Sequence, residues 1–247
     1  MAGHSHWAGI KHKKGKADKQ RSKIFSKLSK EITVAAKLGD KDPNLNPRLR
    51  SAIQLAKASS FPKENIDRAI KKSLDKDTVN YDQMRYEGFG PAGTSIIVEA
   101  LTDNRNRTAS NVRSSFQKFG GSLGETGSVS HAFKHYGFLK FNKDVATEDE
   151  FFNFSIENGA EDCFVEEDEY EAVCLPDTMS KFYDLLAAKY GEPVSSGFQW
   201  RPDVLVKVDG DKLKSLINLI NELDSDEDVQ QIFSNFEASD EELSRIA

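Results

Sequence analysis

The feature that most constrains what this chain can fold into is a change of character near residue 76. Residues 1–76 carry 19 Lys and Arg against 7 Asp and Glu, a net charge of +12, whereas residues 77–247 carry 15 against 33, a net charge of −18. A basic region that must also fold is typical of proteins that bind a phosphate backbone, and the acidic remainder would repel nucleic acid and confine it to one face. The alternative is a lysine-rich surface that only keeps the chain in solution.

The composition predicts a folded protein in a reducing compartment. Hydrophobic residues make up 38% of the 247 residues, enough to build a core in each of two or three domains. No run of about eighteen apolar residues occurs, so we expect neither a membrane span nor export. Residues 11–30 are basic and contain serine, as in an organellar transit peptide, but they continue into a helical pattern, which favours a cytoplasmic location. Cys163 and Cys174 fit two buried thiols better than a disulfide or a metal site.

The basic region predicts a flexible arm followed by three helices. Residues 1–17 are rich in Gly, Lys and His and show no helical or strand period. From Asp18, a candidate N-cap, apolar residues recur at helical spacing, and two further helices are expected to begin near Pro47 and Pro62. Two helices joined by a short turn leave a helix-turn-helix-like placement open.

Phosphate contacts are expected from the lysines and arginines of the arm and of the first two helices, and Trp7 either stacks on a base or anchors the arm to the protein. His4, His6 and His12 have neither Cys nor a carboxylate at metal-ligand spacing, so no metal site is predicted. The predicted nucleic-acid-binding residues are Lys11, Lys13, Lys14, Lys16, Lys19, Arg21, Lys23, Lys27, Lys30, Arg48 and Arg50.

After residue 76 the pattern becomes mixed. Strands are expected over 95–101 and 129–133, with a helix over 104–118 between them. A compact βαββαβ series follows, which is the ferredoxin-like order. Its elements are expected over 136–141, 147–158, 162–165, 170–174, 178–190 and 194–200.

Three further elements, a strand over 204–208, a helix over 212–223 and a strand over 229–233, would complete a second βαβ–βαβ set with the elements that precede the insertion. The predicted fold class is α+β: an N-terminal three-helix domain followed by two α+β domains, one of them ferredoxin-like and inserted into the other. The expected boundaries are a flexible basic arm over 1–17, a helical nucleic-acid-binding domain over 18–76, a discontinuous α+β domain over 77–134 plus 202–247, and the inserted domain over 135–201.

Two motifs are weighed as candidate anion-binding sites. The segment YEGFGPAG at 86–93 is followed by a strand-like run where a phosphate-binding loop would need a helix, and so predicts a tight turn between strands. In LTDNRNRTASNVRSSF, Thr102 or Asp103 can cap a helix, which places Arg105, Arg107 and later Arg113 in its N-terminal half. Cations oppose the helix dipole there, so the arginines serve either an anion or partner site or a structural ion pair with the acidic C-terminal half.

These motifs together resemble a known family. MAGHSHWAGIKHKKGKADKQRSKIFSKLSKEI, NPRLRSAI, PKENIDRAIKK and YEGFGPAGTSIIVEALTDNRNRT with GGSLGETGSV look like the YebC/PmpR family, which includes the mitochondrial translational activator of cytochrome oxidase. The resemblance implies a helical domain and two α+β domains around a cleft. It also implies a role in gene expression, through DNA-binding transcriptional regulation in some members and ribosome-linked translation in others.

We therefore predict a non-catalytic, DNA-binding transcriptional regulatory protein without cofactor or metal. The alternative is a ribosome-associated translation activator that binds ribosomal RNA with the same basic residues. No nucleophile with a His and acid partner is identifiable, and the Asp and Glu residues are too numerous for a catalytic pair to stand out.

The net charge of +12 predicts that affinity for duplex DNA falls steeply with salt. Because each phosphate contact releases a counterion, about four to six contacts should give a log–log slope of roughly −4 to −5. Fluorescence anisotropy with a labelled duplex, from about 50 to 200 mM salt, measures this slope. An affinity independent of salt, or undiminished binding by residues 77–247 alone, would contradict the prediction.

Overall fold

The computed structural model describes residues 17–75 and 80–246, so the predicted arm lies outside the described residues except for Ala17. The helices are α2 (Ala17–Leu38), α3 (Pro47–Ala58), α4 (Lys63–Lys72), α5 (Arg105–Lys118), α6 (Glu148–Glu157), α7 (Met179–Tyr190), α8 (Gly210–Ser225) and α9 (Asp240–Ile246). The strands are β1 (Asp82–Phe89), β2 (Ser95–Thr102), β3 (Ser122–Leu123), β4 (Phe133–Asn142), β5 (Asp162–Val165), β6 (Glu169–Cys174), β7 (Ser195–Pro202), β8 (Val206–Lys207), β9 (Val229–Ser234) and β10 (Phe236–Glu237).

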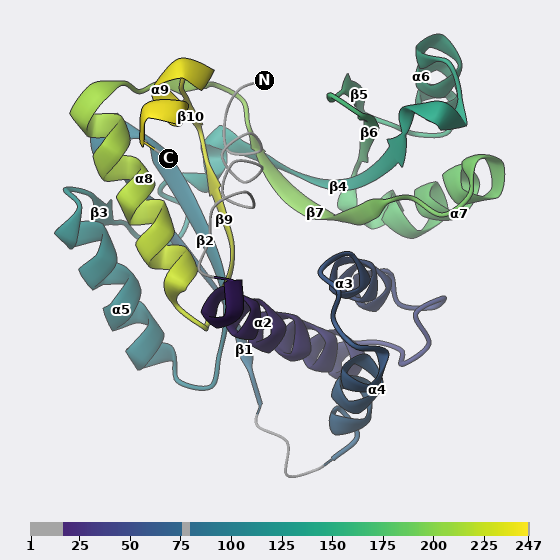
Figure 1. Ribbon diagram of the computed structural model, residues 1–247, viewed down its shortest axis with the longest axis horizontal. Coiled ribbons are helices and arrows are strands. Elements are labelled where there is room, and N and C mark those ends of the chain that lie inside the picture. Colours follow the sequence, from purple (N-terminus) through teal and green to yellow (C-terminus); the bar gives the residue numbers. More distant parts are fainter. Residues whose placement is uncertain (1–16, 76–79, 247) are drawn as a thin grey trace. The chain divides into compact units, whose positions relative to one another are not determined.

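The chain forms an α+β fold with N-terminal helices and two compact units (Figure 1). Of the described residues, unit 1 comprises 17–30, 80–134 and 200–246, and unit 2 comprises 31–75 and 135–199. Helix α2 is therefore shared, since residues 17–30 belong to unit 1 and residues 31–38 to unit 2. The domain boundaries expected from the sequence stay a prediction.

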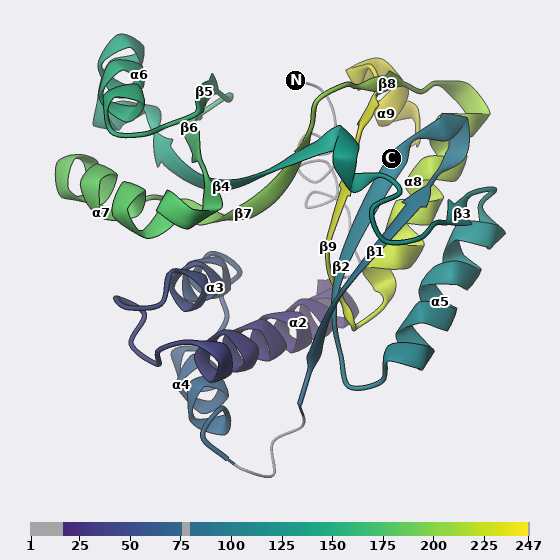
Figure 2. The ribbon, with the colours of Figure 1, turned by 180° about the vertical axis from the view of Figure 1, so that it is seen from behind.

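The sheet of unit 1 is antiparallel, with strand order β3-β1-β2-β9 (Figure 2). Its central strand β2 sends Ile96, Val98 and Ala100 into a core that α5 and α8 share. The predicted turn at Pro91–Gly93 is confirmed as a short 3₁₀ turn between β1 and β2. The buried face of the amphipathic helix α8 supplies Leu213, Leu216, Ile217, Leu219, Ile220 and Leu223.

The strand expected over 129–133, at the opposite face of this sheet, is wrong. Residues 130–132 form a 3₁₀ turn, and β4 begins only at Phe133. Buried Glu87 on β1 explains the difference, because its Oε2 accepts the backbone N–H groups of Val129 (2.9 Å) and Ser130 (2.8 Å) and so removes them from any strand ladder. Burial opposes the charge of Glu87, but the N–H groups of this loop outweigh burial and lower its pKa.

The second βαβ–βαβ set predicted for unit 1 is wrong. Strand β8, shorter than the expected run over 204–208, does not join the main sheet but pairs in parallel with β10. Strands β1, β3 and β10 and helix α9 were not predicted. The signal for β1 was present, since apolar Met84 and Tyr86 alternate with charged Arg85 and Glu87.

The ferredoxin-like unit is confirmed within unit 2. Its elements run β4-α6-β5-β6-α7-β7, and its strands lie in the order β5-β6-β4-β7. Helices α6 and α7 share one core with the sheet, in which fully buried Phe151 stacks on Tyr170 with ring centroids 5.0 Å apart. Cys163 and Cys174 are free and buried, and burial raises the pKa of each thiol to about 11.

Residues 31–75 form the helical part of unit 2. Asn46 caps α3 by accepting the N–H of Leu49, and its amide donates to the carbonyls of Ala35 in α2 and Asp40. Thr33 of α2 donates to the carbonyl of Ala69 in α4. One side chain thus sets the end of α2 against the start of α3, and another joins α2 to α4.

A fragment of residues 135–201 is expected to fold by itself, because α6, α7 and their four strands enclose a core of their own. Well-dispersed amide signals in its NMR spectrum, with cooperative thermal unfolding, would be the expected result. A collapsed spectrum without dispersion would mean that this unit depends on the rest of the chain.

Candidate nucleic-acid interface

The predicted basic residues fall into three groups in the structure. Lys11, Lys13, Lys14 and Lys16 lie outside the described residues, and the side chain of Lys19 is likewise not described. Arg21, Lys23, Lys27 and Lys30 follow one another along the first half of α2, and Arg48 and Arg50 belong to α3. Asp18 lies inside α2, not at its N-cap.

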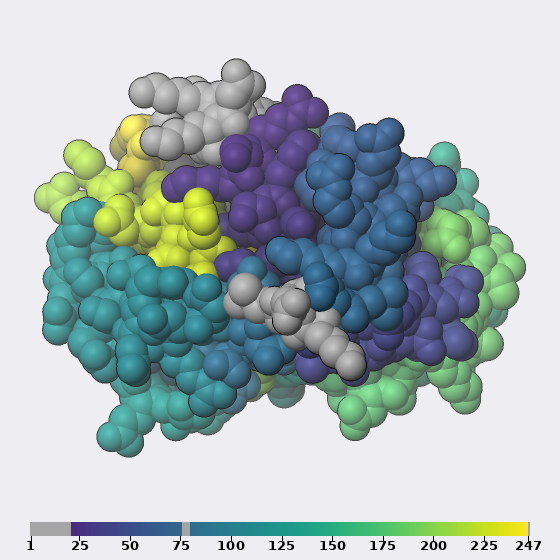
Figure 3. Space-filling model, turned by 90° about the horizontal axis from the view of Figure 1, so that it is seen from below, coloured from purple at the N-terminus to yellow at the C-terminus, as the bar shows by residue number. Residues whose placement is uncertain are grey.

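Two lysines of α2 contact the end of α8. Lys23 Nζ donates to the carbonyl of Ser225 at 2.8 Å, and Lys27 Nζ donates to the carbonyl of Asp224 at 2.7 Å and pairs with its Oδ1 at 3.2 Å. Helix α8 ends at Ser225, where the helix dipole favours cations. The part of α2 that follows residue 20, purple in Figure 3, accordingly abuts the yellow segment that contains this junction.

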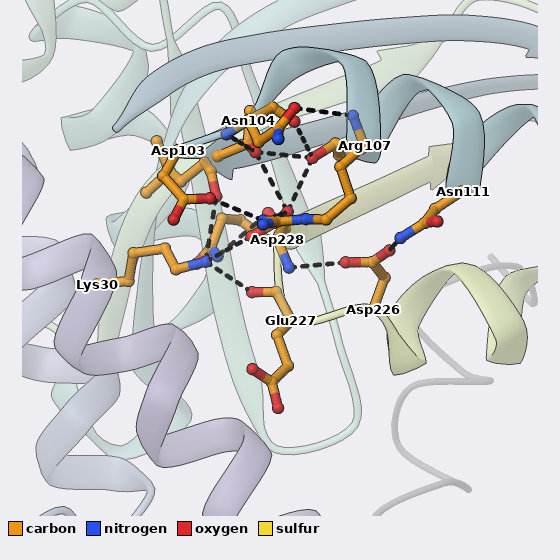
Figure 4. Close-up of polar contacts among 12 residues, drawn as sticks. Lys30, Asp103, Asn104, Arg107, Asn111, Asp226, Glu227 and Asp228 are labelled. Atoms are coloured by element: carbon orange, nitrogen blue, oxygen red, sulfur yellow. Dashed lines mark hydrogen bonds and ion pairs between the residues drawn. The ribbon is translucent and has the colours of Figure 1, made fainter. Parts of the chain in front are cut away.

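Lys30 reaches a buried carboxylate, Asp228, at the start of β9 (Figure 4). Its Nζ lies 2.9 Å from Asp228 Oδ1 and also donates to the carbonyls of Leu101 and Glu227. The Lys30 side chain is 11% exposed and that of Asp228 is 7% exposed. This lysine is therefore enclosed by the protein.

Asp228 is also held from α5 and β2. Its Oδ2 accepts from Arg107 at 2.6 Å, from Thr108 at 2.8 Å and from Thr102 at 3.2 Å. Burial by itself would raise the pKa of Asp228, but the donors Lys30, Arg107 and Thr108 outweigh it and hold the pKa at about 2. The carboxylate is therefore ionised at every physiological pH.

The N-cap of α5 is Asn104, not Thr102 or Asp103. Asn104 has an extended backbone and its side chain accepts the N–H of Arg107 at 3.0 Å. Thr102 does not serve as the cap because its hydroxyl accepts the N–H of Asn104 and donates to Asp228.

The arginines of α5 meet carboxylates. Arg105 forms a two-pronged pair with exposed Asp82 at 2.8 and 2.9 Å, and Arg107 pairs with Asp103 as well as Asp228. These carboxylates raise the pKa of both arginines and supply the negative charge that a helix N-terminus favours. The structure thus contains the ion-pair arrangement with the C-terminal half, through Asp228. Anion binding by Arg105, Arg107 and exposed Arg113 stays a prediction.

The arginines of α3 are also engaged. Arg48 forms a two-pronged pair with Glu31 at 2.6 and 3.0 Å. Arg50 donates to the carbonyls of Pro43 and Asn44 and lies 4.1 Å from the ring centroid of Tyr183. Both residues therefore stabilise unit 2 in this structure.

Helix α4 presents basic residues that the sequence-based list omitted. Ile66 and Ala69 are buried, whereas the basic side chains of this helix lie on its exposed face. The signal was the spacing in KENIDRAIKK, where charged positions alternate with apolar ones at a helical period. The exposed basic residues of this region are Lys57 at the end of α3 and Lys63, Arg68, Lys71 and Lys72 in α4.

Other kinds of site are not found in the part of the chain that the structure describes. Over residues 17–75 and 80–246, no helix is long and apolar enough to span a membrane. The same residues contain no group of three or more His, Cys, Asp or Glu side chains that would hold a metal ion.

Comparisons with known proteins cover nearly the whole chain. The family model for the TACO1/YebC protein N-terminal domain matches residues 5–76, and the model for the TACO1/YebC second and third domain matches residues 81–236. A probable transcriptional regulatory protein of Pelagibacter ubique (strain HTCC1062) is 52% identical over 238 residues, which are 95% of this chain and 98% of that protein. The crystal structure of a conserved hypothetical protein from Aquifex aeolicus is 40% identical, with a TM-score of 0.82 and coverage of 95% of this chain and 98% of that one.

Replacing Asp228 by Asn is expected to destabilise unit 1 by about 3 kcal/mol at pH 7, because it leaves Lys30 and Arg107 without their buried carboxylate. The pKa of Asp228 is lowered on folding, so its contribution is present above the unfolded pKa near 4 and is lost as pH falls through about 2. The stability difference between wild type and Asp228→Asn in urea should therefore shrink from pH 4 to pH 2. Asp82→Asn, at the exposed pair with Arg105, is the control and should change little. A constant difference across this pH range would contradict the assignment.

Proposed function

This chain belongs to the TACO1/YebC family, and we propose that it is a transcriptional regulatory protein that binds DNA through its basic N-terminal region and catalyses no reaction. Its relative from Pelagibacter ubique carries the name of a probable transcriptional regulatory protein and aligns over almost the full length of both chains. The resemblance to the YebC/PmpR family is confirmed. Cytoplasmic location is part of the proposal.

The observation that carries DNA binding is the exposed basic face of α4 with the end of α3. Lys63, Arg68 and Lys71 are exposed, and no hydrogen bond or ion pair of their side chains occurs among the described residues. Lys27 and Lys30 of α2 and the two arginines of α3, by contrast, already contact protein oxygens. Charges without a protein partner are the ones that can bind phosphates at no cost to the fold.

In this proposal, the arm and α4 contribute differently to DNA binding. The arm adds Lys11, Lys13, Lys14 and Lys16 as further phosphate contacts, and α4 supplies a rigid face that fixes the orientation of the duplex. Phosphate contacts position a protein on DNA without reading its sequence, so they account for affinity and not for a target site. Ribosomal RNA offers the same phosphate chemistry and is the alternative partner that the experiment separates.

Neutralising α4 tests the proposal. The triple change Lys63→Gln, Arg68→Gln, Lys71→Gln should weaken binding to mixed-sequence duplex DNA and reduce the steepness of its salt dependence by about 2 to 3, because three phosphate contacts are lost. Anisotropy titrations at several salt concentrations measure both quantities. The matched control is Lys207→Gln, Lys212→Gln, Lys214→Gln, which removes the same charge from exposed positions of β8 and α8 in unit 1.

If the α4 variant and the control lose the same affinity for duplex DNA, the effect comes from net charge alone, and the assignment of the binding face to α4 is contradicted. A ribosomal RNA fragment titrated in parallel distinguishes the two partners. Much tighter binding to that fragment than to duplex DNA, with the same dependence on α4, would favour the translation alternative over the proposed one.

A further inference from the structure

We propose that the acidic junction between α8 and β9, residues 224–228, occupies the lysines of α2 as an internal substitute for a phosphate backbone, and that this contact limits nucleic-acid binding through α2. The proposal rests on the proposed function and concerns its regulation. The junction has the sequence DSDED, with four carboxylates in five residues. It is the segment that receives the lysine stripe of α2, defined as Lys23, Lys27 and Lys30.

The geometry of α2 makes the stripe a single binding surface. Residues separated by four and then three positions lie on one face of a helix, about 6 and 4.5 Å apart along its axis. All three ammonium groups meet oxygens of the same junction, Lys23 at Ser225, Lys27 at Asp224 and Lys30 at Glu227 and Asp228. The junction therefore satisfies the whole stripe at once, as a strand of phosphates would.

The electrostatics of the junction resemble those of a bound anion. The carbonyls of Asp224 and Ser225 stand at the C-terminus of α8, where the helix dipole places partial negative charge. Carboxylates of Asp224 and Asp228 add full charges to Lys27 and Lys30. A nucleic acid that approaches α2 must therefore displace an anionic surface that is already in place.

The junction neutralises the charge of the lysine stripe and also blocks the access of phosphates to it. The side chains of Lys27 and Lys30 are only 13% and 11% exposed while the contact is made. The exposed carboxylate of Glu227 carries no contact in Figure 4, and its charge adds to the negative potential of the junction. The two residues of the stripe with the strongest internal contacts are thus unavailable to phosphates in the docked state.

The contact has an outer part, made by Lys23 and Lys27, and an inner part, made by Lys30. The outer part can open while the inner part stays in place. Lys23 and Lys27 bind the end of α8, where the Asp224 side chain is 42% exposed, whereas Lys30 belongs to the buried network around Asp228. A pair whose carboxylate is partly exposed to solvent is weak and competes poorly with a polyanion, whereas breaking a pair that is buried on both sides is strongly destabilising. Release of Lys23 and Lys27 would add two phosphate contacts and leave the fold of unit 1 intact.

The test weakens the outer contact and asks whether DNA binds better. Asp224→Asn with Glu227→Gln removes two charges at the junction and spares Asp228. This variant should bind mixed-sequence duplex DNA several-fold more tightly than wild type, with a salt slope steeper by about 1, because Lys27 loses its carboxylate partner and the junction loses a second negative charge. The control Glu157→Gln with Glu161→Gln removes the same charge from exposed positions in unit 2 and should leave the slope unchanged.

A four-residue variant shows whether the gain comes from the stripe. Adding Lys23→Gln and Lys27→Gln to the junction variant should abolish the gain in affinity and slope, while melting temperatures confirm that each variant is folded. The proposal fails if the junction variant binds like wild type, if the control gains as much, or if the gain survives the lysine changes. If neither wild type nor any variant binds DNA, the proposed function and the inference about the junction are both refuted. If binding depends on α4 but not on the junction, only the inference about the junction is refuted.

Discussion

The structure of unit 1 depends on one buried carboxylate. A charge can be kept in a protein interior only when it is paired and hydrogen-bonded, and Asp228 meets that condition by drawing Lys30 from α2, Arg107 and Thr108 from α5, and Thr102 from β2. These partners lie between 120 and 198 positions away along the chain. A single desolvated group thus joins the basic N-terminal helix to the acidic α+β part of the protein.

This network changes what the charge of the N-terminal region means for function. A net charge of +12 counts residues, whereas binding depends on charges that no protein group has neutralised. The lysine stripe of α2 already meets the α8–β9 junction, and Arg48 already meets Glu31. In the proposed function, phosphates therefore bind the exposed basic face of α4, which carries fewer charges than the total.

Sequence patterns predicted the elements whose stability is local. The βαββαβ order of the inserted unit is confirmed because each of its helices and strands carries its own hydrophobic period. The predictions were wrong where hydrogen bonds from a distant side chain determine the local backbone conformation. The N–H groups of Val129 and Ser130 are taken by Glu87, and Thr102 gives its hydroxyl to the Asp228 network, so a 3₁₀ turn replaces one expected strand and Asn104 caps α5.

The sequence by itself determined the family, the α+β class, the inserted ferredoxin-like order and the concentration of positive charge in the first 76 residues. These follow from short-range periodicity, from motifs and from counting, all of which are properties of the chain read in one dimension. Tertiary structure alone decided which charges remain available. Lys27 and Lys30 differ from Lys63 and Lys71 in no property of the residue itself, but only the first two lie against carbonyls and carboxylates nearly 200 positions away, because ion pairing depends on distance in space and not on separation along the chain.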